Sequence, residues 1–188
     1  MKGEHMKVIV MAVAALVVAP MVVGPDFAKL LKDAKSNLSE AIDLGLKEAK
    51  DGTVVKAEIE EENGKIIWTM DIAQGDKIRE VGLTVSDNKV VENAEEKEDQ
   101  SALVKAFKIT ATKAIAAALK KCDGKAVCIE LKLEKEKPVA EVKIFKDGAC
   151  KNVIVNGETG EVVKVEEPKA KSGTGMGKDE EKDEEDDE

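Results

Sequence analysis

The sequence has no tyrosine, one tryptophan and three phenylalanines. So few aromatic rings argue against the stacking platforms with which proteins bind single-stranded nucleic acid. The only histidine, His5, lies in a predicted export segment at the N-terminus, so the rest of the chain has no imidazole for a Ser-His or Cys-His pair. No strand pattern leads into a glycine-rich phosphate loop. We therefore expect no enzyme activity and no cofactor.

An excess of basic over acidic residues is also missing. The net charge is −9, and the last ten residues, Asp179–Glu188, hold nine acids and one lysine, which leaves the remainder at −1. A nearly neutral body offers no basic surface for nucleic acid. Residues 167–188 have too little apolar area to fold and are predicted to form a disordered acidic tail. The tail keeps the protein soluble, or it captures Ca²⁺ or a basic partner weakly.

The N-terminus carries a targeting segment. Lys2 and Lys7 precede an uncharged apolar run, Val8–Val23, which is the layout of a secretory signal. The run is shorter than a membrane-spanning helix and contains Pro20. Residues 1–24 are therefore predicted to be a cleaved signal peptide or a retained N-terminal anchor. Either one places the protein outside the cytoplasm, in the periplasm, secreted or anchored to the membrane.

The chain contains an internal repeat. When the sequence is shifted by 73 residues against itself, seven residues of the first helical stretch meet identical residues of the second. They are Leu30, Lys32, Lys35, Ala41, Ile42, Leu46 and Lys47, opposite Leu103, Lys105, Lys108, Ala114, Ile115, Leu119 and Lys120. After the helices the offset falls to 72, and Val55, Val90 and Val91 still match. A duplication explains this agreement best.

Each copy is predicted to form two helices followed by alternating strands, with the first helices near Asp26–Lys35 and Gln100–Lys108. Asn37 and Thr110 are the predicted N-caps of the longer helices, and Asn63-Gly64 is a strong hairpin signal. Alternation with one polar face indicates an antiparallel sheet that helices cover on its other face. The predicted fold class is α+β, with two tandem modules, each a helix pair packed on a three- to four-stranded antiparallel sheet. The predicted boundaries are 25–92 and 100–166, with a charged junction at 93–99.

Strand parity separates the core from the outer faces. Trp68 shares parity with Ile66, Met70 and Ile72 and is predicted to lie in the core. On the outer face of the second sheet, parity gathers apolar residues into a candidate partner-binding patch: Cys128, Phe145, Cys150 and Ile154. The alternative is that this face packs against the other module or against a second chain. With the turn at Asp147-Gly148, Phe145 is expected opposite Cys150. The outer face of the first sheet is predicted to be polar, with Lys56 opposite Asp71 and with Glu60-Glu61 as an ordinary solvated strand edge.

The three cysteines form neither an obvious metal site nor an obvious disulfide. Their spacing fits no zinc pattern, and no histidine accompanies them. Cys128 and Cys150 fall on strands that a third strand separates, beyond the disulfide reach of about 7 Å between Cα atoms. Cys122 ends a helix on the opposite face from Cys128. We expect no metal site, and pairing among the three stays open.

The second copy resembles the PepSY domain. The residues that carry the resemblance are Ile109-Thr110, Ala114-Ile115, Gly124 and the turn Thr159-Gly160-Glu161-Val162-Val163. The first copy is similar, with Asn37 for the threonine and Ser86-Asp-Asn-Lys89 for the turn. The tandem layout is also similar to that of the beta-lactamase inhibitor protein. The resemblance implies an extracytoplasmic module of the kind found in propeptides of secreted metalloproteases, with an inhibitory role toward proteases.

Two functions follow as expectations. The first is an exported, non-catalytic binding or regulatory protein that modulates a secreted or envelope protease, with a protein partner and no nucleic acid. The alternative is an envelope-associated structural or acidic ion-buffering protein in which the repeats are scaffold. The sequence leaves the identity of the partner and the oligomeric state open.

Overall fold

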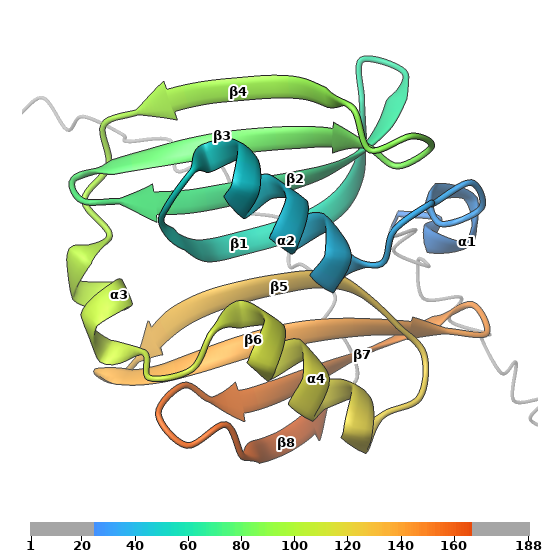
Figure 1. The fold of residues 1–188 in the computed structure, drawn as a ribbon. Coiled ribbons are helices and arrows are strands. Elements are labelled where there is room, and N and C mark those ends of the chain that lie inside the picture. The colour runs from blue at the N-terminus through green and yellow to red at the C-terminus, as the bar shows by residue number, and fades with distance from the viewer. Residues whose placement is uncertain (1–24, 167–188) are drawn as a thin grey trace, which may run out of the picture.

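The computed structural model describes residues 25–166. The predicted export segment, residues 1–24, and the predicted acidic tail, residues 167–188, lie outside them. The described chain is one eight-stranded antiparallel sheet with four helices, two of which, α2 (Leu38–Ala49) and α4 (Ala111–Lys121), lie side by side on the same face of the sheet (Figure 1). Two short helices, α1 (Phe27–Leu30) and α3 (Ser101–Ala106), lie at opposite ends of the molecule.

The strands form two meanders that meet in the middle of the sheet. Their order is β4-β3-β2-β1-β5-β6-β7-β8. The bounds are β1 (Thr53–Glu62), β2 (Lys65–Gln74), β3 (Lys77–Thr84), β4 (Val90–Glu96), β5 (Lys125–Glu134), β6 (Lys137–Lys146), β7 (Ala149–Asn156) and β8 (Val162–Glu166).

The α+β class and the antiparallel pairing are confirmed, but the expected division into two sheets needs correction. β1 and β5 pair across the middle, where Ala57 lies opposite Ile129. Both side chains are buried and belong to one core cluster that draws residues from both halves of the chain. Because β1 and β5 have apolar inward faces, pairing them lets the two helix-covered faces merge into one core. Parity alone does not reveal which strand of one half lies beside the other half.

Local signals act as predicted at most element ends. Asn37 caps α2, its side chain accepting from the Glu40 amide at 3.1 Å while Glu40 accepts from the Asn37 amide at 2.9 Å. Thr110 caps α4, where its hydroxyl accepts a hydrogen bond from the Lys113 amide at 3.3 Å. Trp68 is fully buried, as predicted from its parity. The first hairpin turns at Asn63 and Gly64, which both have positive φ, as a type I′ turn requires.

Two element bounds differ from the expectation. α1 ends at Leu30, well before Lys35, which instead donates its amide to the carbonyl of Val85 at 2.8 Å. β4 runs on to Glu96, into the predicted junction 93–99, because Glu95 binds Lys77 at 2.5 Å and Arg79 at 2.9 Å on the neighbouring strand. The charged stretch is therefore partly an edge strand.

The two halves share loop geometry as well as element order. The amide of Lys35 donates to Val85 in the first half, and the amide of Lys108 donates to Gly157 in the second at 2.9 Å. In the last turn of each half, Asn88 donates to Thr84 and Gly160 donates to Asn156, at 2.8 and 2.9 Å. Asn88 and Gly160 both have positive φ, so asparagine replaces the glycine that this turn favours.

Helix α2 approaches the sheet at a glycine. A Cβ on Gly45 would lie 2.5 Å from Sδ and 2.9 Å from Cε of Met70, which is fully buried on β2. At the corresponding positions of the second half stand Ala118 and Val142, both also fully buried. In the first half the smaller helix residue, Gly45, is combined with the larger strand residue, Met70. In the second half the larger helix residue, Ala118, is combined with the smaller strand residue, Val142.

This exchange predicts a double-mutant result. Gly45→Ala alone should lower the free energy of unfolding by about 1 kcal/mol, because overpacking costs about 1–3 kcal/mol and the gain in helix propensity offsets about 1. Met70→Val alone should cost about 1–2 kcal/mol through the cavity it leaves. The double variant should recover part of both losses, with a coupling of about 1–3 kcal/mol in urea unfolding. Strictly additive losses would contradict the proposed packing.

Candidate functional site

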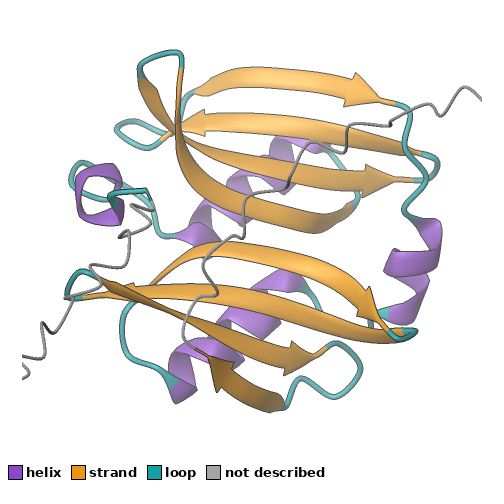
Figure 2. Cartoon of the chain, turned by 180° about the vertical axis from the view of Figure 1, so that it is seen from behind, coloured by secondary structure: helices purple, strands orange, loops and turns teal. Residues whose placement is uncertain are grey.

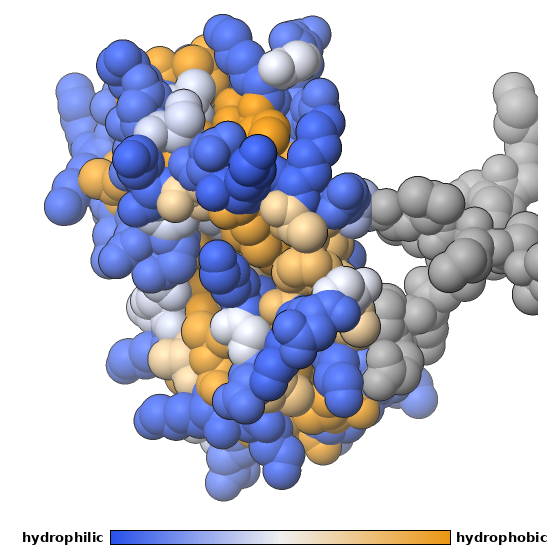
Figure 3. Space-filling view, turned by 90° about the vertical axis from the view of Figure 1, so that its right-hand side faces the viewer, coloured by the Kyte–Doolittle hydropathy of each residue, from blue (hydrophilic) through white to orange (hydrophobic). Residues whose placement is uncertain are grey.

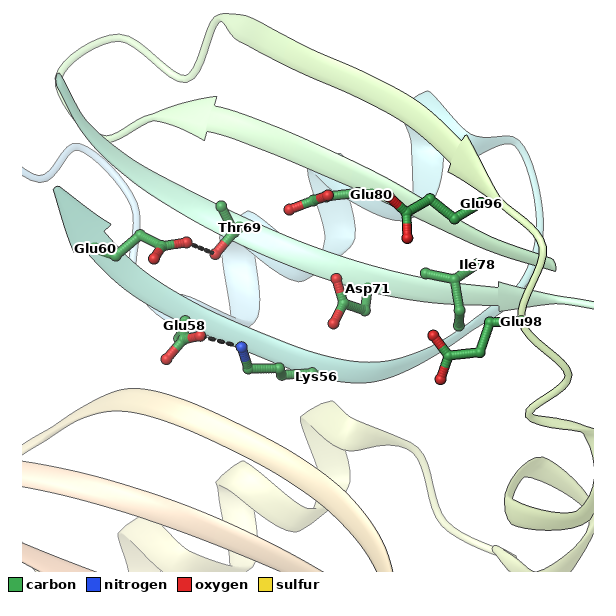
Figure 4. A pocket seen from close by; sticks show the side chains of 9 residues that line it. All are labelled: Lys56, Glu58, Glu60, Thr69, Asp71, Ile78, Glu80, Glu96 and Glu98. Carbon is green, nitrogen blue, oxygen red and sulfur yellow. Dashed lines mark hydrogen bonds and ion pairs between the residues drawn. The ribbon is translucent and has the colours of Figure 1, made fainter. Parts of the chain in front are cut away.

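The face of the sheet opposite to α2 and α4 carries no helix along most of its length (Figure 2). On the first half of this face, β1, β2 and β3 present outward residues that are mostly acidic. They line a hollow with a volume of about 350 Å³, formed by Lys56, Glu58, Glu60, Thr69, Asp71, Ile78, Glu80, Glu96 and Glu98. We call this the acidic hollow. Its carboxylates come from three neighbouring strands and from β4 and the segment that follows it (Figure 4).

Helix α3 closes one end of the acidic hollow. A small second core forms there from Val55, Ala73 and Ile78, against which Leu103 and Val104 of α3 pack. These apolar residues point to the outer face, so α3 covers a part of the sheet that would otherwise expose them. The chain between β4 and α3 consequently passes over the rim of the hollow and brings Glu98 to it.

Two carboxylates of the hollow face each other directly. Asp71 on β2 lies opposite Glu80 on β3, and like charges at opposed positions destabilise a sheet. Burial raises the pKa of Asp71; the Lys56 ammonium counteracts this and the carboxylates of Glu58, Glu98 and Glu60 add to it. Burial also raises the pKa of Glu80, with repulsion from Glu92 and Asp71 as further causes.

Only part of this negative charge is paired within the hollow. Lys56 forms an ion pair with Glu58, and Glu60 accepts a hydrogen bond from the Thr69 hydroxyl at 2.6 Å (Figure 4). Lys56 also lies opposite Asp71, as the sequence predicted. One lysine among six carboxylates leaves an excess of negative charge facing solvent, which suits a cationic or basic partner.

The second half builds the same part of its sheet differently. Glu130 and Glu141 also oppose each other, on β5 and β6, but Lys132 bridges them with contacts of 3.0 and 2.8 Å. Glu60 occupies the position that corresponds to Lys132. Residues 25–99 carry 11 basic and 19 acidic residues, whereas residues 100–166 carry 13 and 9, so the halves differ in sign.

The four residues of the predicted partner-binding patch are not gathered on one exposed surface. Phe145 lies opposite Cys150, as predicted, but its ring packs on Phe27 of α1 with centroids 5.8 Å apart. Ile154 is buried at 4% exposure, between Glu141 and Lys164 on the neighbouring strands. Cys128 is only partly exposed, and whether the four bind a partner stays a prediction. Figure 3 looks at the side on which α1 lies and shows hydrophilic residues over most of it, with hydrophobic residues between them.

The cysteines are three free thiols. Cys128 and Cys150 lie on β5 and β7 with β6 between them, as the strand assignment predicted. Burial raises the pKa of the Cys128 thiol to about 11, and burial also raises the pKa of Cys150. A thiol that stays protonated at neutral pH is neither a nucleophile nor a metal ligand.

Sequence reasoning missed the acidic hollow. It assigned Glu60 to an ordinary solvated strand edge and described the outer face of the first sheet simply as polar. The usable signal was that outward positions on three successive strands carry acids, at Glu58, Asp71 and Glu80.

Among residues 25–166, no three His, Cys, Asp or Glu side chains are placed to hold a metal ion. The helices within the same residues are all too short or too polar to cross a membrane.

Comparison with known proteins supports the predicted resemblance. Residues 108–166 match the family model of PepSY, the peptidase propeptide and YPEB domain. This match confirms the resemblance predicted from Ile109-Thr110 through Val163. No curated protein matches the chain significantly.

Two solved structures are similar over most of the chain. One is a candidate lipoprotein from Clostridium difficile 630, 20% identical, with a TM-score of 0.43, covering 71% of this chain and 97% of that one. The other is the YpeB C-terminal domain of Bacillus megaterium, 18% identical, with a TM-score of 0.29, covering 73% of this chain and 69% of that one. Both TM-scores are low, so neither likeness carries a functional argument.

The raised pKa values of Asp71 and Glu80 predict that the protein loses stability as pH rises from about 4 toward neutrality. Their raised pKa means that the folded chain holds protons which the unfolded chain has released, so the free energy of unfolding falls through that range. Glu80→Gln should raise the free energy of unfolding at pH 7 by roughly 0.2–1 kcal/mol and flatten the profile, measured by urea unfolding at several pH values.

Glu95→Gln is the matched control. Its hydrogen bond with Lys77 lowers the pKa of Glu95, so neutralising it should destabilise the protein at pH 7. If both variants shift stability in the same direction, the repulsion between Asp71 and Glu80 is not what sets the profile.

Cys128 should be almost unreactive in the folded protein. With its pKa raised from 9.0 to about 11, the native thiolate fraction near pH 8 falls roughly a hundredfold, so alkylation by iodoacetamide should slow at least as much relative to the chain in urea. Peptide mass spectrometry after timed alkylation measures this. Rapid native labelling at Cys128 would show that the strand exposes it.

Proposed function

We propose that the whole chain is an extracytoplasmic, non-catalytic protein that binds and restrains a peptidase, on the basis of the match of residues 108–166 to the PepSY family model. The observation that carries the proposal is the match to the peptidase propeptide family over α4 and all four strands of the second half. A propeptide acts on its enzyme through contact rather than chemistry, so the function needs a surface and no reactive group.

The proposal includes a duplicated architecture. Residues 25–92 form a first PepSY-like repeat and residues 100–166 a second, joined through 93–99. The matching amide contacts of Lys35 with Val85 and of Lys108 with Gly157 support this division, as does the identical element order. The repeats are fused edge to edge through β1 and β5, so that a single sheet offers the partner one long face on which residues 25–166 place only helix α3.

The acidic hollow is the part of that face which we propose to contact the peptidase. Its excess carboxylates fit a basic segment of the partner, and its position away from α2 and α4 leaves it accessible. Cys128 of the predicted partner-binding patch lies beside the acidic hollow, since it is opposite Glu58 on β1. Cys128 therefore belongs to the rim of the same contact, whereas Ile154 is buried between Glu141 and Lys164.

The test uses the full chain and the secreted peptidases of the organism that encodes it. The full chain should be recovered outside the cytoplasm, should co-purify with a peptidase and should slow its hydrolysis of a peptide substrate. Glu58→Gln/Glu80→Gln/Glu96→Gln should weaken binding by about tenfold or more, because each desolvated charge at an interface contributes more than about 1 kcal/mol.

The control carries the same change in charge elsewhere. Glu134, Glu136 and Glu158 are exposed and lie outside the hollow, so their triple Gln variant should bind within about twofold of the original chain. A chain that neither retains nor slows any secreted peptidase would refute the proposed function. Retention of cations alone would favour the alternative, an acidic ion-buffering protein of the envelope.

A further inference from the structure

A groove lies on the outward side of α4, away from the acidic hollow. It has a volume of about 520 Å³ and is lined by Lys113, Ala116, Ala117, Lys120, Lys121, Gly160 and Val162. We call it the lysine groove. The alanines and Val162 form an apolar floor between the helix and β8, and the three lysines are exposed along its sides.

The charge of the lysine groove is uncompensated by its surroundings. Within residues 25–166, the ammonium groups of Lys113, Lys120 and Lys121 take part in no ion pair or hydrogen bond. The half of the chain that contains them, residues 100–166, has a net charge of +4. Three unpaired cations beside an apolar floor favour an occupant that is strongly acidic.

The corresponding side of α2 has the opposite character. Glu40, Asp43 and Glu48 stand at the positions that match Lys113, Ala116 and Lys121, and only Lys120 is matched by another lysine, Lys47. The two helices have the same length to within one residue and the same relation to the sheet. The basic groove is therefore a property of α4 alone and not of the repeat, so the structure offers its own internal comparison.

We propose that the lysine groove is the docking site of the chain's own acidic segment, Asp179–Glu188. This segment carries a charge of −8 within ten residues, and it is the densest negative charge in the sequence. It follows β8, whose residue Val162 is part of the groove wall. The occupant is thus tethered to the strand that borders its site.

The connecting length permits this contact. The structure describes the chain to Glu166, about 13 Å beyond Val162 along β8 at 3.3 Å per residue. Residues 167–178 add twelve residues, which span up to roughly 40 Å when extended, enough to turn back to α4. A tether of this length gives a local concentration in the millimolar range, so weak charge pairing suffices to occupy the groove.

Docking of the tail makes occupancy of the lysine groove dependent on salt, since interactions between exposed charges are screened beyond about 10 Å at 0.1 M ionic strength. The tail then masks α4 in dilute salt and exposes it when salt or a more acidic partner competes.

Carbodiimide crosslinking of the full chain tests the contact. A 1:1 mixture of ¹⁴N- and ¹⁵N-labelled chains is treated at low salt, and the crosslinked peptides are identified by mass. Tail carboxylates should join Lys113, Lys120 or Lys121 about tenfold more often than Lys105, Lys135 or Lys137, which are exposed outside the groove, because the tether and the charges favour the groove. Each crosslink should contain a single isotope.

Variants provide a readout that does not depend on a reactive lysine. In Lys113→Gln/Lys120→Gln/Lys121→Gln, the amide NMR signals of Asp179–Glu188 should move to the positions they adopt at high salt. The Gln variant of Lys105, Lys135 and Lys137 should leave them unchanged. Crosslinks of mixed isotope would overturn the proposal by assigning the groove to a second copy of the chain. Equal labelling of all six lysines, or tail signals that ignore the groove variant, would also overturn it.

Discussion

The whole architecture depends on the pairing of β1 with β5. This contact comprises three residue pairs, with Ala57 opposite Ile129 in the centre, whereas the hairpins on either side each have nine residue pairs. It nevertheless decides that both helices lie on one face, that one core extends under them, and that the opposite face is a continuous surface. Without it, each half would expose a long edge strand with unpaired backbone groups.

Much of this fold was accessible from sequence because it rests on local rules. Helix caps at Asn37 and Thr110, the turn at Asn63-Gly64 and the burial of Trp68 follow from side-chain chemistry within a few residues. The contact between β1 and β5 does not, because it joins residues 72 positions apart and any strand with an apolar face could have supplied it. The acidic hollow was missed for the same reason, since its acids are ordinary on each strand and unusual only when the strands lie together.

The two halves reach the same backbone with different side chains. Gly45 and Met70 correspond in position to Ala118 and Val142, and the hydrogen-bonded pair Ser36 and Asn88 corresponds in position to Ile109 and Gly160. Each exchange conserves the fit of a pair rather than the identity of a residue, as close packing requires. Charge is not conserved in this way. Glu60 and Lys132 differ in sign at matched positions, so the surfaces have specialised while the interior has been maintained.

The register of β1 and β5 has a consequence for the origin of the chain. Ala57 pairs with the residue 72 positions later, which is its own counterpart in the other half, while Lys56 pairs with Glu130 and Glu58 with Cys128. This arrangement has twofold symmetry about the central pair. The same register is the one that two identical edges would adopt in an isologous dimer, whose formation would depend on concentration. Because both edges belong to one polypeptide, their association is independent of dilution.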